Sequence, residues 1–546
     1  MNNLVATIEM PRNEPIRSYA PGTPERTALK KRLQELKAQE IEIPVIIGGK
    51  AIYTGRTGEI RPPHELKHRL GIFHKAGAPE VEQAITNALE AQQEWARMHW
   101  EDRFAIFLKA AELLSERWRY TLNAATMLGQ SKNPFQAEID SACELIDFFR
   151  FNVYFARRIY EDQPISPQGV WNRMQYRPLE GFIFAVPPFN FTSIEGNLPT
   201  APAIMGNVVL WKPAPDATYS AYFIYKLLEE AGLPPGVIQF LPGDGPDVGD
   251  PALASPHFSG LHFTGSIPTF EHLWRKIGEN VANYRYYPRV VGETGGKDFV
   301  VAHPSADIDA LVTAIVRGGF EYQGQKCSAV SRVYIPESIW PTVREQLIEI
   351  LKTIKMGPVE DFTNFMNAVI NRKAFEKITS YIEHARQAPE AEIIYGGNYS
   401  DEEGYFIEPT VILVRDPYYR SMREEIFGPV VSIYVYPDSQ FSDTLELVDK
   451  STPYGLTGAV FAQDRQALIE ATDALEQAAG NFYINDKPTG AVVAQQPFGG
   501  ARKSGTNDKA GSYLNLLRWV SARAIKETFD PPRDYRYPFM QPDEEV

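Results

Sequence analysis

Apolar residues in the first third of the chain recur every three or four positions. This spacing places them on one face of a helix and predicts amphipathic helices that pack against a core. One such face comprises Val81, Ala84, Ile85, Ala88 and Leu89, and a second comprises Phe104, Phe107, Leu108, Ala111 and Leu114. We expect an earlier helix near residues 24–40 and a later one from about Gln136 to Ala156. The N-terminal part of the chain is therefore predicted to be mainly helical.

From residue 181 the pattern changes to short apolar segments that end in proline or glycine. Helix-compatible segments lie between most of them, and the apolar segments read GFIFAVP, NVVLWKP, VIQFLPG and GLHFTG. This alternation is typical of βαβ units that build a parallel sheet covered on both faces. Ligands of such sheets bind beyond the carboxyl ends of the strands. We therefore expect functional residues directly after these segments.

A second region of alternating strands and helices begins near Gly292. FVVAH predicts a strand, and Ser305 is expected to cap a helix whose apolar face runs from Ile308 to Val316. Further helices are expected near residues 337–355 and 371–388, with more strands up to about residue 505. The tail after Asp530 is rich in proline, aspartate and tyrosine, which predicts an extended arm. The chain as a whole is predicted to be an α/β protein.

Length and charge narrow the class of protein. The chain has 546 residues, of which 44% are hydrophobic, so a large core and more than one domain are expected. Its net charge of −14 argues against binding to nucleic acid, which needs a basic surface. No apolar stretch approaches the roughly 18 residues that cross a bilayer, so we expect no membrane partner. A small molecule is the favoured ligand.

Cysteine content and the N-terminal residues bear on the compartment. The two cysteines, Cys143 and Cys327, are too few for a disulfide framework, which favours a reducing environment. The first twenty residues have no basic segment followed by an apolar one, unlike a secretory signal. They also contain Glu9 and Glu14, which is unlike a mitochondrial presequence. The sequence thus favours a cytosolic location.

One candidate catalytic pair is a cysteine and a glutamate next to glycines. Cys143 lies in the helical run SACELIDFF and fits a buried core position. Cys327 instead follows the polar, turn-prone residues Gly324-Gln325-Lys326, which favours an accessible thiol. Glu293 precedes Gly295-Gly296 and is either a solvated loop residue or a general base on a mobile backbone. Together Cys327 and Glu293 indicate nucleophilic catalysis.

A second candidate is the zinc-protease pattern H-E-x-x-H-x-x-G-x-x-H, which residues 64–74 match in full. That site requires His64 and His68 on one face of a helix, with Glu65 beside a metal-bound water. Pro62-Pro63 stand directly before the motif and prevent a helix from extending upstream. The residues around Ile60 and Ile72 alternate as short edge strands do. A metal site here is therefore disfavoured, and we expect none.

Several short motifs resemble those of the aldehyde dehydrogenase superfamily. In order along the chain they are PPFNF, LWKP, FTGS, GETGGK, GQKCSA, EEIFGP and QPFGG, and the likeness extends from near the first helix to about residue 530. The longer runs AEIDSACELIDFFRFN, FEYQGQKCSA and GNFYINDKPTGAVVAQQPFGGARKSGTNDK resemble the branch that oxidises L-glutamate γ-semialdehyde. The resemblance implies NAD-dependent oxidation of that aldehyde to L-glutamate, the second step of proline catabolism. Another small aldehyde is the alternative substrate.

The resemblance also implies an organisation of the chain. A Rossmann-like NAD-binding domain with the N-terminal helices would comprise residues 1–160 and 180–292, and an α/β catalytic domain would comprise 293–505. An oligomerisation hairpin and a C-terminal arm would comprise 161–179 and 506–546, with the tail strand at 521–529. A homodimer or an assembly of dimers is implied, and a separate proline dehydrogenase is a candidate partner.

The catalytic roles follow from the same resemblance and suit the chemistry. Cys327, as a thiolate, attacks the aldehyde carbon. The oxyanion that forms accepts hydrogen bonds from the Asn190 side chain and the Cys327 backbone N–H. Glu293 activates the water that hydrolyses the thioester. A fold retained for binding without turnover is the remaining alternative, and the presence of all three residues argues against it.

The implied cofactor site uses residues after the predicted strands. Gly265, Ser266 and Thr269 lie where a helix start would face the pyrophosphate. Lys212 would bind the adenosine ribose, Glu425 the nicotinamide ribose, and Phe427 would lie beside the nicotinamide ring. Pro187 occupies a position that often touches the cofactor. The G-x-G-x-x-G motif is missing, and Pro215 replaces a carboxylate that in many relatives helps to reject NADP.

The implied substrate site has an anchor for a carboxylate. Ser328, Gly490 and Ala491 match the family positions that hold it through one hydroxyl and two backbone N–H groups. Phe191 and Phe498 would wall the aliphatic chain. Glu144 is a candidate partner for the ammonium group of an amino-acid substrate.

Overall fold

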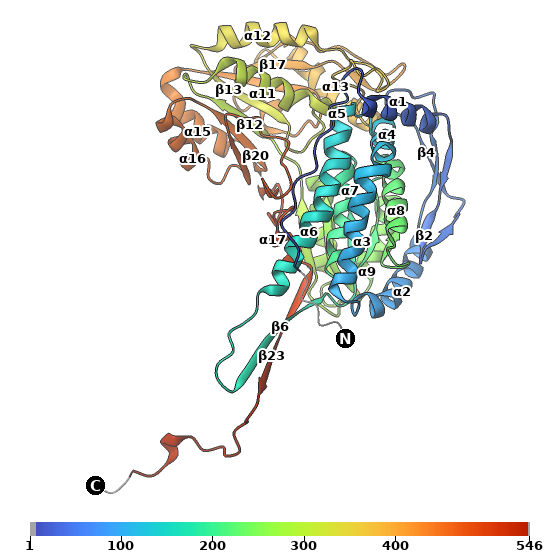
Figure 1. Cartoon of the computed structure of the whole chain (residues 1–546). Coiled ribbons are helices and arrows are strands. Elements are labelled where there is room, and N and C mark those ends of the chain that lie inside the picture. The colour runs from blue at the N-terminus through green and yellow to red at the C-terminus, as the bar shows by residue number, and fades with distance from the viewer. Residues whose placement is uncertain (1–6, 544–546) are drawn as a thin grey trace.

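The computed structural model describes residues 7–543 and contains two seven-stranded sheets (Figure 1). In the first sheet, the neighbours β11, β10, β7, β8 and β9 are all parallel, and β2 and β3 continue it antiparallel. The strands of this sheet, in spatial order, are β11 (Arg289–Glu293), β10 (Phe258–Thr264), β7 (Phe182–Val186), β8 (Val208–Trp211), β9 (Ile238–Phe240), β2 (Val45–Ile47) and β3 (Lys50–Ile52). The parallel sheet predicted from residue 181 onward is confirmed.

The second sheet is parallel except at one edge, where β14 runs antiparallel to β17. Its strands, in spatial order, are β14 (Ala391–Tyr395), β17 (Thr410–Val414), β18 (Val430–Tyr436), β13 (Val330–Pro336), β12 (Asp298–Ala302), β20 (Thr457–Phe461) and β21 (Asn481–Ile484). Alternate side chains of β12 enter two different cores: Phe299 and Val301 lie in one, and Val300 and Ala302 in the other. The sheet is therefore buried on both faces, as continuous apolar strands predict.

The N-terminal helices pack against the first sheet and share its core. They are α1 (Pro24–Lys37), α2 (Ala78–Trp95), α3 (Trp100–Leu113), α4 (Arg119–Gln130) and α6 (Glu144–Glu161). The two helical faces predicted from periodicity are those of α2 and α3. The helix predicted from about residue 136 is interrupted, because a short α5 (Pro134–Ala137) passes through a π-helical stretch (Glu138–Cys143) before α6 begins.

The remaining helices connect the strands of the two sheets. Those of the first sheet are α7 (Thr192–Ile204), α8 (Thr218–Ala231), α9 (Gly245–Ala254) and α10 (Ile267–Asn280). Those of the second are α11 (Ile308–Phe320), α12 (Trp340–Thr353), α13 (Arg372–Gln387), α14 (Arg420–Arg423), α15 (Phe441–Lys450) and α16 (Arg465–Ala474), and α17 (Tyr513–Leu517) follows near the C-terminus. Among the helices of residues 7–543, none has both the length and the apolarity of a membrane span.

The expected cap of α11 is wrong. Ser305 does not cap the helix; its Oγ instead accepts hydrogen bonds from the backbone N–H groups of Gln463 and Asp464, at 3.0 and 2.9 Å. Asp307 is the N-cap, and its carboxylate accepts the Ala310 N–H at 3.0 Å. Because the first helical residue is Ile308, the residue directly before it is the one placed to cap.

A two-stranded ribbon extends away from both sheets, and the C-terminal arm continues beyond it (Figure 1). In this ribbon β6 (Val170–Pro178) pairs antiparallel with β23 (Val520–Thr528) along its whole length. The segments predicted to form a hairpin therefore pair, although most of the chain separates them. The arm carries exposed aromatic side chains, at Tyr535, Tyr537 and Phe539.

Candidate active site

Residues predicted to bind the cofactor follow neighbouring strands of the first sheet. Pro187 comes directly after β7, Lys212 after β8 and Gly265 after β10, while Glu293 ends β11. These strands are parallel neighbours, so their carboxyl ends meet at one edge of the sheet. The backbone N–H of Gly265 donates to the Glu293 carbonyl at 3.1 Å. The structure therefore brings these positions together.

The loop that carries Cys327 has a strained backbone. Tyr322 and Gln323 have φ values of 51° and 56°, and Gly324 has 64°, all in the left-handed region. Such conformations cost roughly 1–2 kcal/mol for each residue with a side chain, and persist where the surroundings impose them. The Gln323 amide is held by the carbonyls of Ser131 and Ala368, at 3.0 and 2.8 Å. This anchoring fixes the loop just before Cys327.

Glycine is required at position 324 for close packing. A Cβ on Gly324 would overlap the carbonyl of Gly428, which follows Phe427. The loop with the thiol and the loop with Glu425 and Phe427 thus touch through their backbones. Cys327 itself remains partly accessible, while Cys143 is buried, as the sequence predicted.

Asn190 reaches the same loop from the first sheet. Its Nδ2 donates to the Gln325 carbonyl at 3.0 Å, and the side chain is buried. An amide nitrogen has two protons, so this bond leaves one available as a donor. The predicted oxyanion donors therefore lie on neighbouring segments.

Burial controls the protonation of Glu293. Its carboxylate accepts the backbone N–H of Gly500 at 3.1 Å. Burial raises the pKa of this carboxyl well above its usual value, and the Gly500 hydrogen bond opposes part of that rise. A carboxylate with a raised pKa is a stronger base, which suits proton abstraction near neutral pH.

The surroundings of Cys327 favour the neutral thiol. Burial raises its pKa well above the usual range, and the carboxylates of Asp298, Glu425 and Glu293 raise it further. A thiolate therefore forms only when a base removes the proton. Glu293 is one of the groups whose charge acts on this thiol, which places base and nucleophile in one electrostatic environment.

Lys212 and the start of α10 offer donors to an anionic cofactor. Burial lowers the pKa of Lys212 to about 8, and its Nζ donates to the Pro213 carbonyl at 3.1 Å. Ser266 is the N-cap of α10 and its Oγ lies 2.8 Å from the hydroxyl of Thr269. The first turn of a helix presents free N–H groups to a phosphate. These donor types fit the ribose and pyrophosphate of a dinucleotide.

Glu425 lies at the junction of the two sheets. Its carboxylate accepts the Gly296 N–H at 3.1 Å, and a Cβ on the neighbouring Gly295 would overlap it. Burial raises the pKa of Glu425. Phe427 has a φ of 62° and its ring meets that of Phe189 edge to face, with centroids 5.8 Å apart. A carboxylate beside glycine backbone is suited to binding ribose hydroxyls.

The predicted carboxylate anchor forms a compact loop. Ser328 Oγ lies 2.8 Å from the hydroxyl of Thr489, the residue before Gly490. Gly490 has a φ of 90°, and the Lys487 ammonium donates to the Thr489 carbonyl at 2.7 Å. Ala491 follows and is half-buried. Ser328 and Gly490 are therefore neighbours in space, as the resemblance implied.

The two predicted aromatic wall residues come from different segments. Phe498 is held by paired backbone hydrogen bonds with Ala510, at 2.9 and 2.8 Å. Phe191 precedes α7, and ammonium groups of Lys132 and Lys326 lie 4.6 and 5.6 Å from its ring centroid. Both phenylalanines are only partly buried, which leaves ring surface for a ligand.

Glu144 begins α6 and accepts a hydrogen bond from the Ser193 hydroxyl. Burial, and after it the charge of Asp140, raises its pKa to about 8. Lys132, Asp140 and Lys326 form an ionic cluster beside it that the sequence did not single out as functional. These charged residues stand out in the sequence within otherwise apolar or turn-forming runs. The sequence does not show that the fold brings the three side chains together.

The three histidines of the motif have hydrogen-bond partners within the protein. Residues 64–69 form turns and irregular backbone between β4 (Thr57–Ile60) and β5 (Gly71–His74). Both segments are short strands as predicted, but only β4 lies at an edge, because β5 pairs with β1 (Ile41–Ile43) on its other side. His64 contacts Ser131, His68 contacts the Lys37 carbonyl, and His74 contacts Glu42. The three rings therefore bond to three different partners and not to a shared one. Within residues 7–543, no group of three or more histidine, cysteine, aspartate or glutamate side chains is placed to hold a metal ion.

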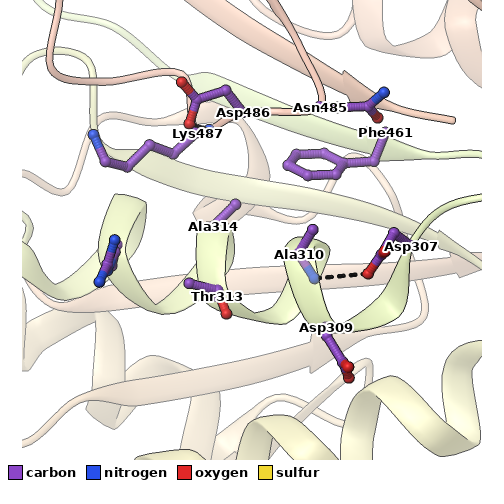
Figure 2. Close-up of a pocket in the computed structure, with 10 residues that line it drawn as sticks. Asp307, Asp309, Ala310, Thr313, Ala314, Phe461, Asn485, Asp486 and Lys487 are labelled. Atoms are coloured by element: carbon purple, nitrogen blue, oxygen red, sulfur yellow. Dashed lines mark hydrogen bonds between the residues drawn. The ribbon is translucent and has the colours of Figure 1, made fainter.

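A cavity of about 470 Å³ lies between α11 and the loop after β21 (Figure 2). Asp307 and Asp309 lie toward one end of the cavity, and Lys487 lies toward the opposite end. At the junction near Glu425 the cavity volume is only about 10 Å³, about the least that holds one water molecule. The larger cavity contains none of the predicted catalytic residues.

Comparison with known proteins agrees with this geometry. The family model described as the aldehyde dehydrogenase family matches residues 54–523, and the chain belongs to that family. A Dictyostelium discoideum protein named Delta-1-pyrroline-5-carboxylate dehydrogenase, mitochondrial, is 52% identical over 98% of this chain and 96% of its own length. A Bos taurus protein of the same name is 52% identical over 97% and 94%.

A solved structure is equally similar. It is the Delta-pyrroline-5-carboxylate dehydrogenase from Mycobacterium tuberculosis bound with NAD, with a TM-score of 0.96 and 52% identity. The match covers 99% of this chain and 100% of that one. The aldehyde dehydrogenase fold expected from the sequence is confirmed.

The expected cytosolic location is wrong, because close relatives are named mitochondrial. A shortage of cysteine excludes a disulfide scaffold but does not distinguish one reducing compartment from another. The acidic residues were also misleading. Glu14 belongs to the folded protein, where it pairs with Arg119 and Arg150. Its presence therefore carries no information about targeting.

Proposed function

We propose that this enzyme oxidises L-glutamate γ-semialdehyde, which equilibrates with Δ1-pyrroline-5-carboxylate, to L-glutamate with NAD. The observation that supports this proposal best is the contact among three segments of the chain. The Cys327 loop contacts Asn190 on one side, and Ser328 contacts the Thr489–Gly490 loop on the other. A nucleophile next to both an oxyanion donor and a carboxylate anchor suits an aldehyde that bears a carboxylate. The names of the two relatives support the same substrate.

The first step is the addition of Cys327 to the aldehyde. Glu293 takes the thiol proton, and the sulfur forms a bond to the carbonyl carbon while the π electrons move to oxygen. The resulting oxyanion accepts hydrogen bonds from the Asn190 amide and the Cys327 backbone N–H. When bound, NAD supplies the acceptor for the hydride that leaves this carbon, and a thioester remains on Cys327.

The second step is hydrolysis. Glu293 returns its proton to solvent and then takes one from a water molecule, whose oxygen attacks the thioester carbon. The carbon–sulfur bond breaks, the product leaves as a carboxylate, and Cys327 regains a proton. The raised pKa of Glu293 makes it a sufficiently strong base for this task.

NAD is held in the proposal by the residues at the sheet edge. Gly265, Ser266 and Thr269 would hold the pyrophosphate, and Lys212 would bind the adenosine ribose. Glu425 would bind the nicotinamide ribose, and Phe427 and Pro187 would line the place of the nicotinamide ring. The donors that follow the parallel strands, and the Glu425 carboxylate beside Gly296, support this assignment.

Both charged groups of the substrate, its α-carboxylate and its ammonium group, have binding partners in this proposal. Ser328, Gly490 and Ala491 bind the α-carboxylate, and Glu144 binds the ammonium group. Phe191 and Phe498 enclose the methylene chain. The half-buried state of these phenylalanines and of Glu144 supports a site open to a small ligand.

We also propose a separate task for each of three parts of the chain. Residues 1–160 and 180–292 bind NAD, 293–505 carry the catalysis, and 161–179 with 506–546 mediate assembly. The ribbon β6–β23 exposes backbone edges, which favour pairing with another subunit. We infer a homodimer or an assembly of dimers, with a separate proline dehydrogenase as the source of the substrate.

Substrate comparison tests the function. The purified protein with NAD is given L-glutamate γ-semialdehyde, 5-oxopentanoate or butanal, and NADH formation and product are measured. The highest kcat/KM is expected for the semialdehyde, with L-glutamate as the product. A preference for butanal would refute the substrate assignment and favour another small aldehyde.

A further inference from the structure

The N-terminal segment, residues 7–23, runs beside α6 before α1 begins (Figure 1). Glu14 holds it in place: the carboxylate pairs with Arg119 and Arg150, and the backbone N–H donates to the Asp147 carboxylate on α6 at 2.7 Å. The Glu14 side chain is only 10% exposed. The segment is therefore a fixed part of the fold at this point.

The preceding residue, Asn13, connects α6 to the anchor loop, which we define as residues 490–498. Its Nδ2 donates to the Asp147 carboxylate at 2.8 Å and to the Val493 carbonyl at 2.9 Å. Its Oδ1 accepts a hydrogen bond from the Gln495 amide at 2.9 Å. An amide nitrogen has two protons, so one serves α6 and the other serves the loop. A single planar group thus joins the two.

The anchor loop contains substrate contacts on both sides of this attachment. Gly490 and Ala491, which are proposed to bind the α-carboxylate, come before Val493, and the proposed wall residue Phe498 comes after it. The loop follows β21 at the edge of the second sheet, yet the Val493 side chain is buried in the core of the first. The N-terminal part of the chain therefore helps to position a loop of the second sheet.

The other side of the connection also leads to a proposed substrate contact. Glu144, the proposed partner of the ammonium group, begins α6, and Asp147 follows about one helical turn later. The ammonium group and the α-carboxylate of an amino acid are attached to the same carbon. Their partners on the protein must therefore keep a fixed separation, and Asn13 hydrogen bonds to both of the segments that carry them.

We propose that Asn13 is a positioning residue for substrate recognition: it fixes the anchor loop against α6, so that the backbone donors for the α-carboxylate are held in place. This inference rests on the proposed function. Asn13 acts through the Val493 carbonyl and takes no part in the chemistry at Cys327. Its contribution is thus to KM for an aldehyde that carries a carboxylate.

The experiment measures kcat and KM of the full chain with NAD for L-glutamate γ-semialdehyde and for butanal, which has no carboxylate. Asn13→Ala should raise KM for the semialdehyde about threefold to tenfold, the range expected when the Val493 carbonyl loses an uncharged donor. The kcat for the semialdehyde, and both constants for butanal, should stay within about twofold of wild type. Equal losses for the two aldehydes, or an unchanged KM for the semialdehyde, would overturn the inference.

Arg17→Ala is the matched control in the same segment. The Arg17 guanidinium donates to the Tyr120 hydroxyl and the Ser115 carbonyl, and these partners lie outside the anchor loop. The control should lower the thermal unfolding temperature without changing KM for either aldehyde. A rise in the semialdehyde KM equal to that of Asn13→Ala would show that any loosening of the segment has this effect, and would overturn the role of Asn13.

An exchange of two side chains separates positioning from stability. Asn13→Asp combined with Asp147→Asn keeps one amide and one carboxylate, so the hydrogen bond between the segment and α6 is retained with its direction reversed. The Val493 carbonyl, however, loses its donor and meets a carboxylate oxygen. The exchanged protein should unfold near the wild-type Tm, but its KM for the semialdehyde should stay raised. A KM that returns to wild type together with Tm would show that Asn13 only supports the fold.

Gln495→Ala covers the case in which the exchanged protein does not fold. It removes the side chain through which the loop donates to Asn13 and leaves the contact with α6 intact. Its KM for the semialdehyde should rise about twofold or more, and its constants for butanal should not change. An unchanged KM for the semialdehyde would count against the connection.

Failure of the proposed function gives a different result. A wild-type protein with a higher kcat/KM for butanal than for the semialdehyde would refute the proposed substrate, and the inference would fall with it. A wild-type preference for the semialdehyde that Asn13→Ala leaves intact would refute the inference alone. A wild-type preference that Asn13→Ala reduces through KM supports both.

Discussion

Replacing Gly490 with valine should separate substrates that carry a carboxylate from those that do not. The glycine has a φ of 90°, in the region that L side chains rarely adopt. A Cβ there would lie 2.7 Å from the Lys487 ammonium, which donates to the Thr489 carbonyl at 2.7 Å. The lysine tip is flexible and can move. The backbone strain cannot be relieved without turning the Gly490 peptide.

The expected loss of kcat/KM follows from the hydrogen bond that this rotation of the Gly490 peptide would remove. A hydrogen bond from backbone N–H to a charged carboxylate contributes about 1.5–3 kcal/mol, so kcat/KM should fall roughly ten- to a hundredfold for the semialdehyde. A β-branched residue in a left-handed conformation adds roughly 1–3 kcal/mol of strain, which pushes the loss toward the upper end or beyond it. Butanal has no carboxylate to anchor, so its kcat/KM should change much less.

The assay measures NADH formation from both aldehydes in wild type, Gly490→Ala and Gly490→Val. Alanine shares the φ restriction but lacks the branched side chain, so its loss should be intermediate. Thermal unfolding of each variant checks that the fold persists. Equal losses for the semialdehyde and butanal would show that Gly490 supports the general architecture of the site and not the carboxylate anchor.

Other substitutions test the chemistry. Cys327→Ala should abolish NADH formation, whereas His64→Ala and a chelator should do little; chelator-sensitive peptidase activity with stoichiometric zinc would overturn the assignment. Glu293→Gln should give a burst of NADH followed by slow turnover in rapid mixing, and a normal steady-state rate would remove it from the mechanism. NAD should have a higher kcat/KM than NADP, because Lys212 suits a ribose hydroxyl, and a ratio at or below unity contradicts this. Glu425→Gln removes a carboxylate that raises the Cys327 pKa, so iodoacetamide should alkylate the enzyme faster at pH 8, and an unchanged rate would count against that coupling.

The fold was largely predictable because hydrophobic periodicity records which faces are buried. The faces of α2 and α3 and the apolar segments of β7, β8 and β10 all became elements of the expected type. The π-helical stretch at Glu138–Cys143 was not predictable, since it differs from an α-helix by a shift in hydrogen bonding and not in composition. The cap of α11 depended on where the helix starts, which periodicity locates only to within a few residues.

The positions of site residues were predictable where a rule of topology relates the order of strands in the sequence to their arrangement in the fold. Residues after parallel strands meet at one edge, so Lys212, Gly265 and Glu293 could be grouped before the structure was known. The left-handed turn at Tyr322 has no such signal, because neither tyrosine nor glutamine favours that conformation. The association of Lys132 with Lys326 depends on packing between distant segments. Such contacts follow from the tertiary structure alone.

In the proposed mechanism, desolvation of both Cys327 and Glu293 allows one carboxylate to serve two steps. Desolvation raises the pKa of each group, so moving the proton from sulfur to carboxylate relocates a buried charge without creating a new one. The charge of Glu293 is also one reason that the thiol pKa is raised, and this opposition disappears once Glu293 holds the proton. Glu293→Gln removes the base and the opposing charge together, so the thiol loses an acceptor but becomes easier to ionise. Hydrolysis of the thioester has no such compensation, because nothing replaces the base that activates water. The variant should therefore acylate at a moderate rate and accumulate the thioester.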